Sequence, residues 1–445
     1  MDNNINDYNS INNVDDTNRK NNEQKVKSSG CFYRGVATGV SVTLAVLIMA
    51  LVINILVNKE YIETDDKDQM LQNAFGSMTS GDVEISEEMM EIFSKAQYIQ
   101  EIIDTYYYYD EDMQDLADGI YAGMLQSLGD PYSVYYDEES FNALMESTTG
   151  TYCGIGVVVQ QDPETMIITV VNPYEGCPGY EAGLQPGDII LGADELDFTN
   201  MDINEAVSYI KGEEDTSVVL HIMRGEEKKD ITVTRRMIDI PTVSYELVEG
   251  NIAHIVIASF DEVTYDQFEE AMEQAEADGC KGYIFDVRDN GGGLYDTVVD
   301  MLDDLLPKGK IVYTEDKSGH QETEYSNSDC LEAPMAVLIN GNSASASEIF
   351  AGAIQDYGVG KIIGTKSFGK GIVQSIMSLG DGTAVKVTIS SYFTPNGRNI
   401  HGEGISPDME IQLPQDENAY ENGYLKPECD TQLQEAIKYI QSELN

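Results

Sequence analysis

Apolar residues between positions 86 and 146 recur at the three-to-four spacing of an amphipathic helix. In the first predicted helix these positions are Met90, Ile92, Phe93, Ala96, Ile99, Ile102 and Ile103. A second helix is predicted over about 113–128, and it ends at Gly129-Asp130-Pro131 because glycine and proline interrupt helices. A third, short helix is expected after Glu138. We therefore expect a helical N-terminal segment over residues 86–147.

From Tyr152 onwards the pattern changes to short apolar runs bounded by turn residues, which are typical of β-strands. The predicted strands cover 156–160, 166–171, 188–193, 217–224 and 229–234, with one helix at 203–211. This pattern indicates a separate β-module over residues 148–236.

Strands and helices alternate from about residue 243, which is typical of an α/β core. The predicted strands are 252–258, 282–287, 311–314, 335–339 and 361–363, and the predicted helices are 265–278, 295–305 and 347–357. A β-rich stretch follows at 371–392, and a terminal helix at 430–443. The predicted fold class is therefore multidomain α/β, with a mixed-sheet core at 237–420 and a C-terminal helix within 421–445.

Residues 36–57 form an apolar run of 22 residues without a charge, which is long enough to span a bilayer as a helix. A cleaved signal peptide is the alternative, but its apolar core would be shorter and a small-x-small cleavage site would follow. The run ends instead in Asn58-Lys59-Glu60-Tyr61. We therefore expect an uncleaved transmembrane anchor at 36–57.

Basic residues precede this run and acidic residues follow it: Lys20, Lys25, Lys27 and Arg34 on one side, and Glu60, Asp65 and Asp66 on the other. Because positively charged flanks stay in the cytoplasm, residues 1–35 are expected to be a cytoplasmic tail and residues 58–85 an extracytoplasmic stalk. The tail holds nine Asn in its first 22 residues, which is typical of disorder. The expected location is the cell membrane, as a single-pass protein with its N-terminus in the cytoplasm and its folded domains outside.

The chain of 445 residues has a formal net charge of −53, and its apolar content of 42% is enough for buried cores. The first 57 residues hold five acids and five bases, so the whole negative excess lies in residues 58–445. Nucleic acid is disfavoured as a partner, because phosphate binding depends on Lys and Arg. A solubility or habitat adaptation accounts for the charge. The six cysteines are widely spaced without a CxxC pair, so no metal site is expected.

Two glycine-rich segments mark the β-module as a peptide-binding domain. Residues 152–156 can form a nest of backbone N–H groups that holds a carboxylate. Residues 176–190 resemble the AGLxPGDxI signature of PDZ domains, and this resemblance covers about 148–236. It implies capture of a peptide C-terminus, with the terminal carboxylate on Gly154, Ile155 and Gly156. The alternative is a PDZ fold whose groove only regulates or packs internally.

A buried strand at 284–287 leads into Gly291-Gly292-Gly293 and then into a predicted helix. Such a turn can point backbone N–H groups at an anion, either a phosphate or the oxyanion of a reaction intermediate. The GxGxxG spacing of a dinucleotide site is absent.

Residues 342–374 place Ser345 in a small-residue turn before a helix and Lys370 between two glycines, 25 residues later. A serine hydroxyl needs a base to take its proton, and a lysine can serve only if its pKa falls from about 10.4 to about 7–8. That change costs roughly 4 kcal/mol of ammonium stability. The acidic surface opposes it, so local desolvation must dominate. Glu348, the acid nearest to Ser345, is interpreted as structural.

Other chemistries compete for these residues. Gly364–Lys370 matches the GxxxxGK phosphate loop, but Gly371 replaces the Ser or Thr that would hold magnesium, and 372–376 is predicted as strand rather than helix. A Ser/His/Asp triad is the rival mechanism, although the four histidines are scattered: His221, His254, His320 and His401. No HExxH motif supports metalloprotease chemistry.

The ordered motifs together resemble the carboxyl-terminal processing peptidases, the tail-specific Ser/Lys proteases with an embedded PDZ domain. The resemblance covers about 86–413 and rests on 123–133, 176–190, 286–294, 343–374, 392–400 and 404–408. The chain departs from the family pattern at Gly291, where proline is usual. The resemblance implies a serine-type endopeptidase without a cofactor, acting on proteins or peptides with accessible C-termini. It is compatible with a homodimer, for which the tyrosine run 106–109 is a candidate surface.

By this resemblance, Ser345 is the nucleophile and Lys370 the general base, and Gln374 orients Lys370. The backbone N–H groups of Gly292 and Ala346 would form the oxyanion hole.

The resemblance also assigns supporting roles, with Gly293 as the alternative oxyanion donor. Ser343 and Ser347 would be structural, and Ser347 would cap the helix that follows. Two other classes of function compete with a protease. One is a PDZ scaffold with an inactive protease domain, and the other is a nucleotide-binding module at 364–370.

Overall fold

The computed structural model describes residues 86–445 except 111, 328–329 and 422–423, and the chain divides into two compact units, residues 1–112 and 113–445. In the first unit, helix α3 (Glu87–Tyr106) begins at Ser86, whose side chain accepts the Met89 N–H. The predicted tail, anchor and stalk lie outside the described residues. No helix of the described part is long and apolar enough to cross a membrane.

The second unit begins with the remaining predicted helices, α4 (Met113–Gln126) and α5 (Glu138–Thr149), separated by the short strand β1 (Val134–Tyr136). The turn before β1 is fixed by Asp130, whose carboxylate accepts the Ser133 hydroxyl at 2.6 Å and the Thr388 hydroxyl at 2.6 Å. This turn therefore docks on the strand that carries Thr388.

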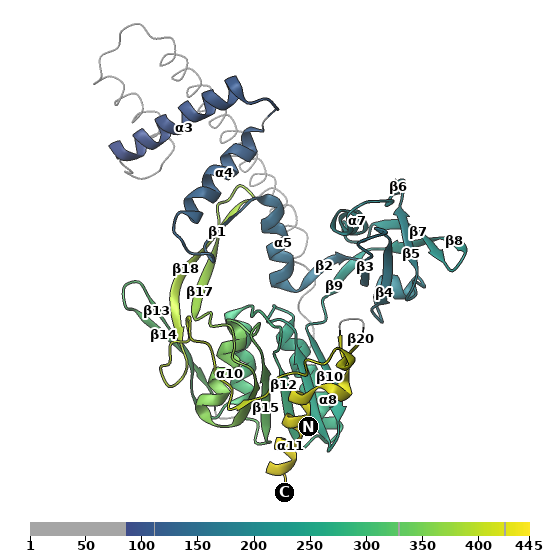
Figure 1. The fold of residues 1–445 in the computed structure, drawn as a ribbon, viewed down its shortest axis with the longest axis vertical. Coiled ribbons are helices and arrows are strands. Elements are labelled where there is room, and N and C mark those ends of the chain that lie inside the picture. The colour runs from purple at the N-terminus through teal and green to yellow at the C-terminus, as the bar shows by residue number, and fades with distance from the viewer. Residues whose placement is uncertain (1–85, 111, 328–329, 422–423) are drawn as a thin grey trace, which may run out of the picture. The chain divides into compact units, whose positions relative to one another are not determined.

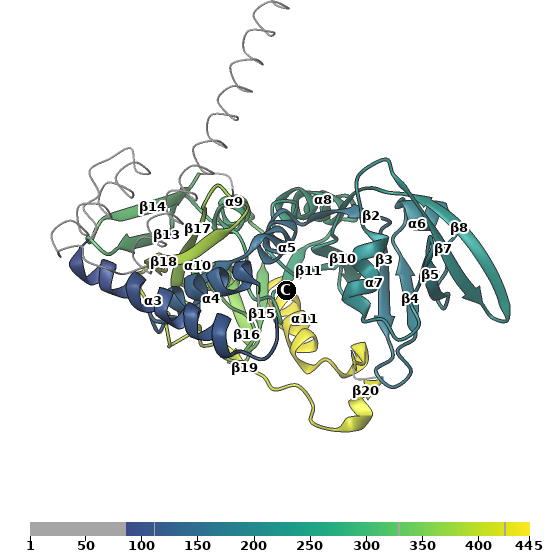
Figure 2. The same ribbon diagram turned by 90° about the horizontal axis from the view of Figure 1, so that it is seen from above.

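An antiparallel β-module follows, with strand order β3-β4-β5-β7-β8 and β6 paired to β5, while β2 and β9 form a separate ribbon. Its elements are β2 (Thr151–Gly154), β3 (Val157–Gln161), β4 (Ile168–Pro173), α6 (Pro178–Glu181), β5 (Ile189–Ala193), β6 (Leu196–Asp197), α7 (Ile203–Ile210), β7 (Ser217–Arg224), β8 (Glu227–Thr234) and β9 (Arg236–Asp239). Figure 2 shows α7 against the strands of this module. The inward residues of β7, Val218, Leu220 and Ile222, alternate along the strand and are fully buried, as the sequence pattern predicts.

The core sheet has strand order β10-β11-β12-β15-β16-β19, and it is parallel except for the antiparallel edge strand β10. Its strands are β10 (Val243–Val248), β11 (Ile252–Ile257), β12 (Gly282–Asp286), β15 (Met335–Ile339), β16 (Gly360–Gly364) and β19 (Met409–Glu410). Its helices are α8 (Thr264–Ala277), α9 (Tyr295–Leu305), α10 (Ala346–Tyr357) and α11 (Thr431–Glu443). The fold is thus a mixed α/β fold, as predicted.

Successive residues of each core strand face opposite sides of the sheet, so both sides are covered (Figure 1). Phe285, Val337 and Ile339 pack in the cluster with α8, α9 and α10. Ile284 and Leu338 pack with α11 on the other side. Burial on both sides explains the near-continuous apolar runs of these strands.

A second sheet, with strand order β1-β18-β13-β14 and β17 paired to β18, carries the rest of the site. Its remaining strands are β13 (Gly309–Asp316), β14 (Gln321–Ser326), β17 (Ile372–Ser378) and β18 (Ala384–Phe393). The C-terminal stretch adds η1 (Glu417–Ala419), β20 (Tyr420–Glu421), β21 (Tyr424–Leu425) and η2 (Pro427–Cys429) before α11.

A buried ion network attaches α11 to the end of β12. The Arg288 guanidinium pairs with Asp286 at 2.5 Å and with Asp430 at 2.8 Å. His254 lies between Asp286 (3.3 Å) and Glu246 (2.8 Å). Burial alone would lower the pKa of His254, but the two carboxylates raise it above its ordinary value. His254 is therefore a structural histidine.

Candidate active site

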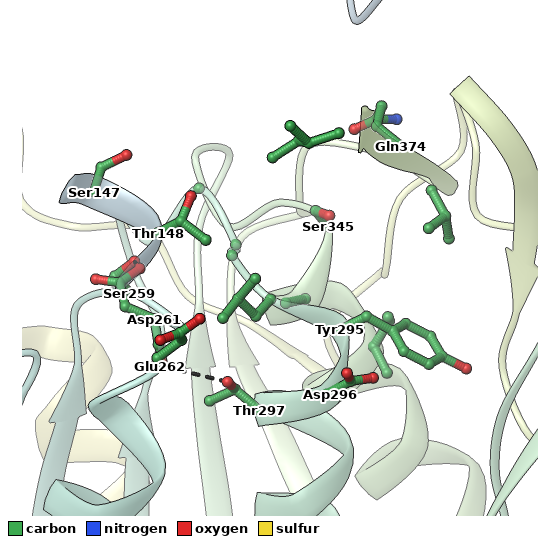
Figure 3. A pocket seen from close by; sticks show the side chains of 18 of the residues that line it. Ser147, Thr148, Ser259, Asp261, Glu262, Tyr295, Asp296, Thr297, Ser345 and Gln374 are labelled. Carbon is green, nitrogen blue, oxygen red and sulfur yellow. Dashed lines mark hydrogen bonds between the residues drawn. The ribbon is translucent and has the colours of Figure 1, made fainter. Parts of the chain in front are cut away.

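A cavity of about 820 Å³ within residues 113–445 brings the predicted catalytic residues together. Ser345, Lys370 and Gln374 all line it, as do Gly292 and Ala346. Figure 3 shows Ser345 at the start of a helix, with Gln374 on a neighbouring strand. The cavity collects residues that are up to 82 positions apart in the chain (374 minus 292), so the tertiary fold assembles the site.

Ser345 lies at the N-cap of α10 with φ 57° and ψ −116°, a backbone conformation that side chains with a Cβ rarely adopt. The turn is held by two neighbours: the Asn290 carbonyl accepts the Ala344 N–H at 3.0 Å and the Ser347 hydroxyl at 2.9 Å. The surrounding packing therefore imposes the strained conformation, which displays the Ser345 hydroxyl at the cavity.

The other two serines of this turn are structural, as predicted. The Ser343 hydroxyl donates to the Val287 carbonyl at 2.7 Å and accepts the Asn340 N–H at 3.0 Å. The prediction that Ser347 caps α10 is wrong, because Ser345 occupies the N-cap and Ser347 lies inside the helix. The two serines differ because the Ser347 hydroxyl finds a tertiary acceptor on the glycine turn, at Asn290.

Glu348 joins the serine turn to the lysine loop. This side chain is fully buried, and its carboxylate accepts the N–H groups of Ser345 (3.0 Å), Gly369 (2.8 Å) and Lys370 (2.8 Å). It also accepts the Ser367 hydroxyl at 2.5 Å. Four donors and the N-terminus of α10 stabilise the buried charge, since the described residues provide no ion pair for it. The structural role predicted for Glu348 is confirmed, and it extends to both loops.

Tyr392 forms a second link between the same two loops. Its side chain is 1% exposed, and its hydroxyl bonds the Ser345 carbonyl at 3.0 Å and the Lys370 carbonyl at 2.8 Å. Burial raises the pKa of Tyr392 well above its ordinary value, so the hydroxyl stays a donor. Sequence reasoning assigned no role to Tyr392, because its carbonyl partners lie 47 and 22 residues away.

Lys370 has the property required of a base. Burial, with a smaller contribution from Lys386, lowers the pKa of Lys370, while Asp130 and Glu348 oppose this shift. Its Nζ lies 4.9 Å from the ring centroid of Tyr132. Across the described residues, no hydrogen bond joins Lys370 Nζ to Ser345 Oγ. The two groups share the cavity, and the lysine side chain must turn from the Tyr132 ring to reach the serine.

Gln374 lies on β17 and lines the cavity, and its Nε2 atom is buried without a hydrogen-bond partner. A buried amide nitrogen without an acceptor is costly. In this conformation Gln374 does not bond Lys370, so its orienting role stays a prediction.

The glycine turn packs directly against the serine turn. A Cβ on Gly292, whose φ is 105°, would lie 2.8 Å from the Ala344 carbonyl oxygen and 2.8 Å from Ser345 Cβ. Only glycine allows this approach. The Gly292 N–H donates to Asn290 Oδ1 at 2.8 Å, whereas the Ala346 N–H has no acceptor among the described residues. The structure thus presents Ala346 as a free donor and Gly292 as an occupied one.

Five carboxylates line the opposite part of the cavity: Asp261, Glu262, Asp266, Asp296 and Asp300. None of the five forms an ion pair with a described residue. Figure 3 shows the labelled members of this group, Asp261, Glu262 and Asp296, away from Gln374. Burial raises the pKa of Asp261 and, together with Asp296, that of Asp300. The cavity therefore has an acidic side and, at Lys370 and Lys386, a basic side.

In the β-module, the predicted carboxylate loop is tightly packed. A Cβ on Gly156, whose φ is 67°, would lie 2.3 Å from Cys177 Cβ, and a Cβ on Gly154 would lie 2.6 Å from the Tyr152 ring. Ile155 is buried in the module's core. The loop is therefore shaped by glycine at both ends, and its peptide-binding role stays a prediction.

The competing chemistries find little support in this geometry. No histidine lines the cavity. His221 bonds Asp230 and the Asp194 carbonyl on the β-module, far in sequence from Ser345. Residues 365–371 lead from β16 into strand β17, whereas a phosphate loop opens a helix. Within the described residues, no cluster of three or more His, Cys, Asp or Glu could hold a metal ion.

Comparison with known families agrees with this arrangement. Peptidase family S41 matches residues 251–411, a PDZ domain matches 169–224, and the N-terminal domain of the activating protease CtpB matches 61–140. The chain is 34% identical over 325 residues to a probable CtpA-like serine protease of Staphylococcus aureus (strain COL), which covers 72% of this chain and 65% of that protein.

A second relative is the carboxy-terminal processing protease CtpA of Bacillus subtilis (strain 168), with 36% identity over 325 residues, 72% of this chain and 69% of that protein. The chain spans about two thirds of the length of these curated relatives. Among solved structures, the photosystem II D1 C-terminal processing protease is 26% identical with a TM-score of 0.43, over 75% of this chain and 96% of that chain. The chain therefore belongs to peptidase family S41, the C-terminal processing peptidases, and carries a PDZ domain ahead of its S41 domain.

Proposed function

We propose that this protein is a serine endopeptidase that cleaves polypeptides at Ser345 with Lys370 as the base. The observation that carries the proposal is the pairing of the two residues in one cavity, with Ser345 held in a strained turn and the pKa of Lys370 depressed by burial. Glu348 and Tyr392 bond both loops, so the two residues are positioned as one unit.

In the first half-reaction, Lys370 rotates from the Tyr132 ring and its neutral Nζ takes the Ser345 Oγ proton. Oγ then bonds the carbonyl carbon of the substrate. The Ala346 N–H stabilises the resulting oxyanion, and Gly292 joins it when its N–H leaves Asn290. The carbon–nitrogen bond breaks, and the leaving amine takes the proton from the Lys370 ammonium. An ester between Ser345 and the acyl half of the substrate remains.

In the second half-reaction, Lys370 takes a proton from water, and the hydroxide oxygen bonds the ester carbon. Collapse of this intermediate breaks the bond to Ser345 Oγ, which regains its proton from Lys370. Gln374 Nε2, which has no partner in the resting conformation, is placed to hold the rotated lysine through a carbonyl-side contact of its amide.

The PDZ domain is proposed to capture the C-terminal carboxylate of the substrate on Gly154, Ile155 and Gly156. The charge asymmetry around residues 36–57 supports a single-pass membrane protein whose catalytic domain is extracytoplasmic. A homodimer through the apolar side chains exposed on α3 is compatible with this arrangement.

The test is cleavage of an unstructured polypeptide by the wild type and by Ser345→Ala and Lys370→Ala, with Ser378→Ala at the far end of β17 as the matched control. We expect the first two variants to lose cleavage by at least about 10³-fold with unchanged circular dichroism, and the control to keep it. Activity retained by Ser345→Ala would reject the assignment. A wild-type protein that binds the peptide and never cuts it would instead favour a PDZ scaffold with an inactive protease domain.

A further inference from the structure

A second lysine, Lys386 on β18, also lines the active-site cavity. The register of the β17–β18 pair explains its position, since Lys386 lies opposite Ile376 and Thr388 lies opposite Gln374. Residues two apart on a strand share one face of a sheet, so Lys386 shares its face with Gln374 and Ile376, which both line the cavity. The pairing therefore fixes Lys386 in the site.

No described carboxylate forms an ion pair with Lys386. Its Nζ lies 5.2 Å from the ring centroid of Tyr136, and Lys370 Nζ lies over the ring of Tyr132 in the same short segment. Two half-buried amines thus occupy the basic side of one cavity, each against a tyrosine ring. Like charges in one partly desolvated site repel, and one of the amines loses its proton more readily.

We propose that Lys386 is a positioning residue that keeps Lys370 neutral, and therefore basic, by charge repulsion across the cavity. This inference rests on the proposed function, in which neutral Lys370 takes the Ser345 proton. The charged groups that act on Lys370 come from three elements: Lys386 from β18 and, in the opposite direction, Asp130 from the turn before β1 and Glu348 from α10. Lys386 is the cation among them, and it adds to the effect of burial.

The experiment measures kcat/KM against pH, from pH 5 to pH 10.5, with a peptide that has no titrating group in that range. The variants are Lys386→Gln, which removes the charge, and Lys386→Arg, which keeps it. Lys366→Gln is the matched control, because Lys366 belongs to the same loop as Lys370 but is exposed and does not line the cavity. We expect Lys386→Gln to move the acid limb of the profile upward by roughly half to one pH unit, a typical coupling at this range in a protein. Activity on that limb then falls about 3- to 10-fold, and the plateau at high pH is kept. Lys386→Arg and Lys366→Gln should follow the wild type.

An unshifted acid limb in Lys386→Gln overturns the inference. So does an equal loss at every pH with an intact fold, which would place Lys386 in contact with the substrate instead. A direct measurement covers a variant with poor activity: the Lys370 amine is titrated by NMR in Ser345→Ala, with and without Lys386→Gln, and Lys370→Ala identifies its signal. A higher midpoint without Lys386 supports the inference, and an equal midpoint overturns it. Wild-type cleavage in the same assay separates this outcome from failure of the proposed function.

Discussion

Removal of the Glu348 carboxylate should damage both the stability of the S41 domain and its catalysis. In Glu348→Ala the three N–H groups of Ser345, Gly369 and Lys370, together with the Ser367 hydroxyl, lose their acceptor inside a fully buried site. Each unsatisfied buried donor costs about 1–3 kcal/mol, and the four share one acceptor, so their costs are not additive. We therefore expect a loss of about 4 kcal/mol in the free energy of unfolding.

Denaturant unfolding and thermal unfolding measure this loss, and a decrease of about 10 °C in Tm corresponds to it for a domain of this size. Glu348→Gln should lose about half as much, because one oxygen is kept while the new NH2 group faces backbone donors. The matched controls are Ser367→Ala, which removes a single donor and leaves the carboxylate in place, and the exposed Glu403→Ala.

Catalysis should fall further than stability. The Ser345 and Lys370 backbones are held to one carboxylate, and a displacement of about 1 Å between reacting groups can cost about 10²-fold in rate. Peptide cleavage by folded Glu348→Gln, measured well below its Tm, should fall by that order. If Glu348→Ala unfolds within about 1 kcal/mol of the wild type and cleaves normally, the carboxylate does not organise the site.

Three further predictions concern other parts of the chain. Gly292→Ala should abolish cleavage while the PDZ domain still binds peptide, since its Cβ would meet Ser345 Cβ at 2.8 Å; unchanged kcat would contradict the close packing of the two turns. Gly156→Ala should weaken binding of a C-terminal peptide at least 10-fold by fluorescence anisotropy, because its Cβ would lie 2.3 Å from Cys177 Cβ, while Ser345 still reacts with a small acylating probe; equal affinity would place the peptide elsewhere. The pKa of His254 is raised in the folded protein, so its stabilising contribution is complete below about pH 6.5 and is lost as the pH rises through the folded pKa; denaturant unfolding of His254→Gln should lack this decline, and a decline that persists would assign it to another group.

Local features of the site could be predicted from the sequence because their chemistry depends on adjacent residues. A serine among small residues before a helix, three glycines after a buried strand and a lysine between glycines are each readable over about ten positions. The helices and strands followed for the same reason, since burial repeats every two or three to four residues along each element. The short strand β1 escaped prediction, because it is formed by pairing with β18, about 250 residues later.

The tertiary structure decided how these local features act together. Glu348 follows Ser345 by three residues, a capping-box spacing that could have drawn attention to it, yet its contact with the lysine loop depends on how α10 meets residues 367–370. Lys386 enters the cavity only through the register of β17 with β18, and a shift by one residue would turn it to the other face. A sequence specifies the types and local order of its chemical groups, whereas distances between groups far apart in the chain follow from packing and strand register, which depend on the whole fold.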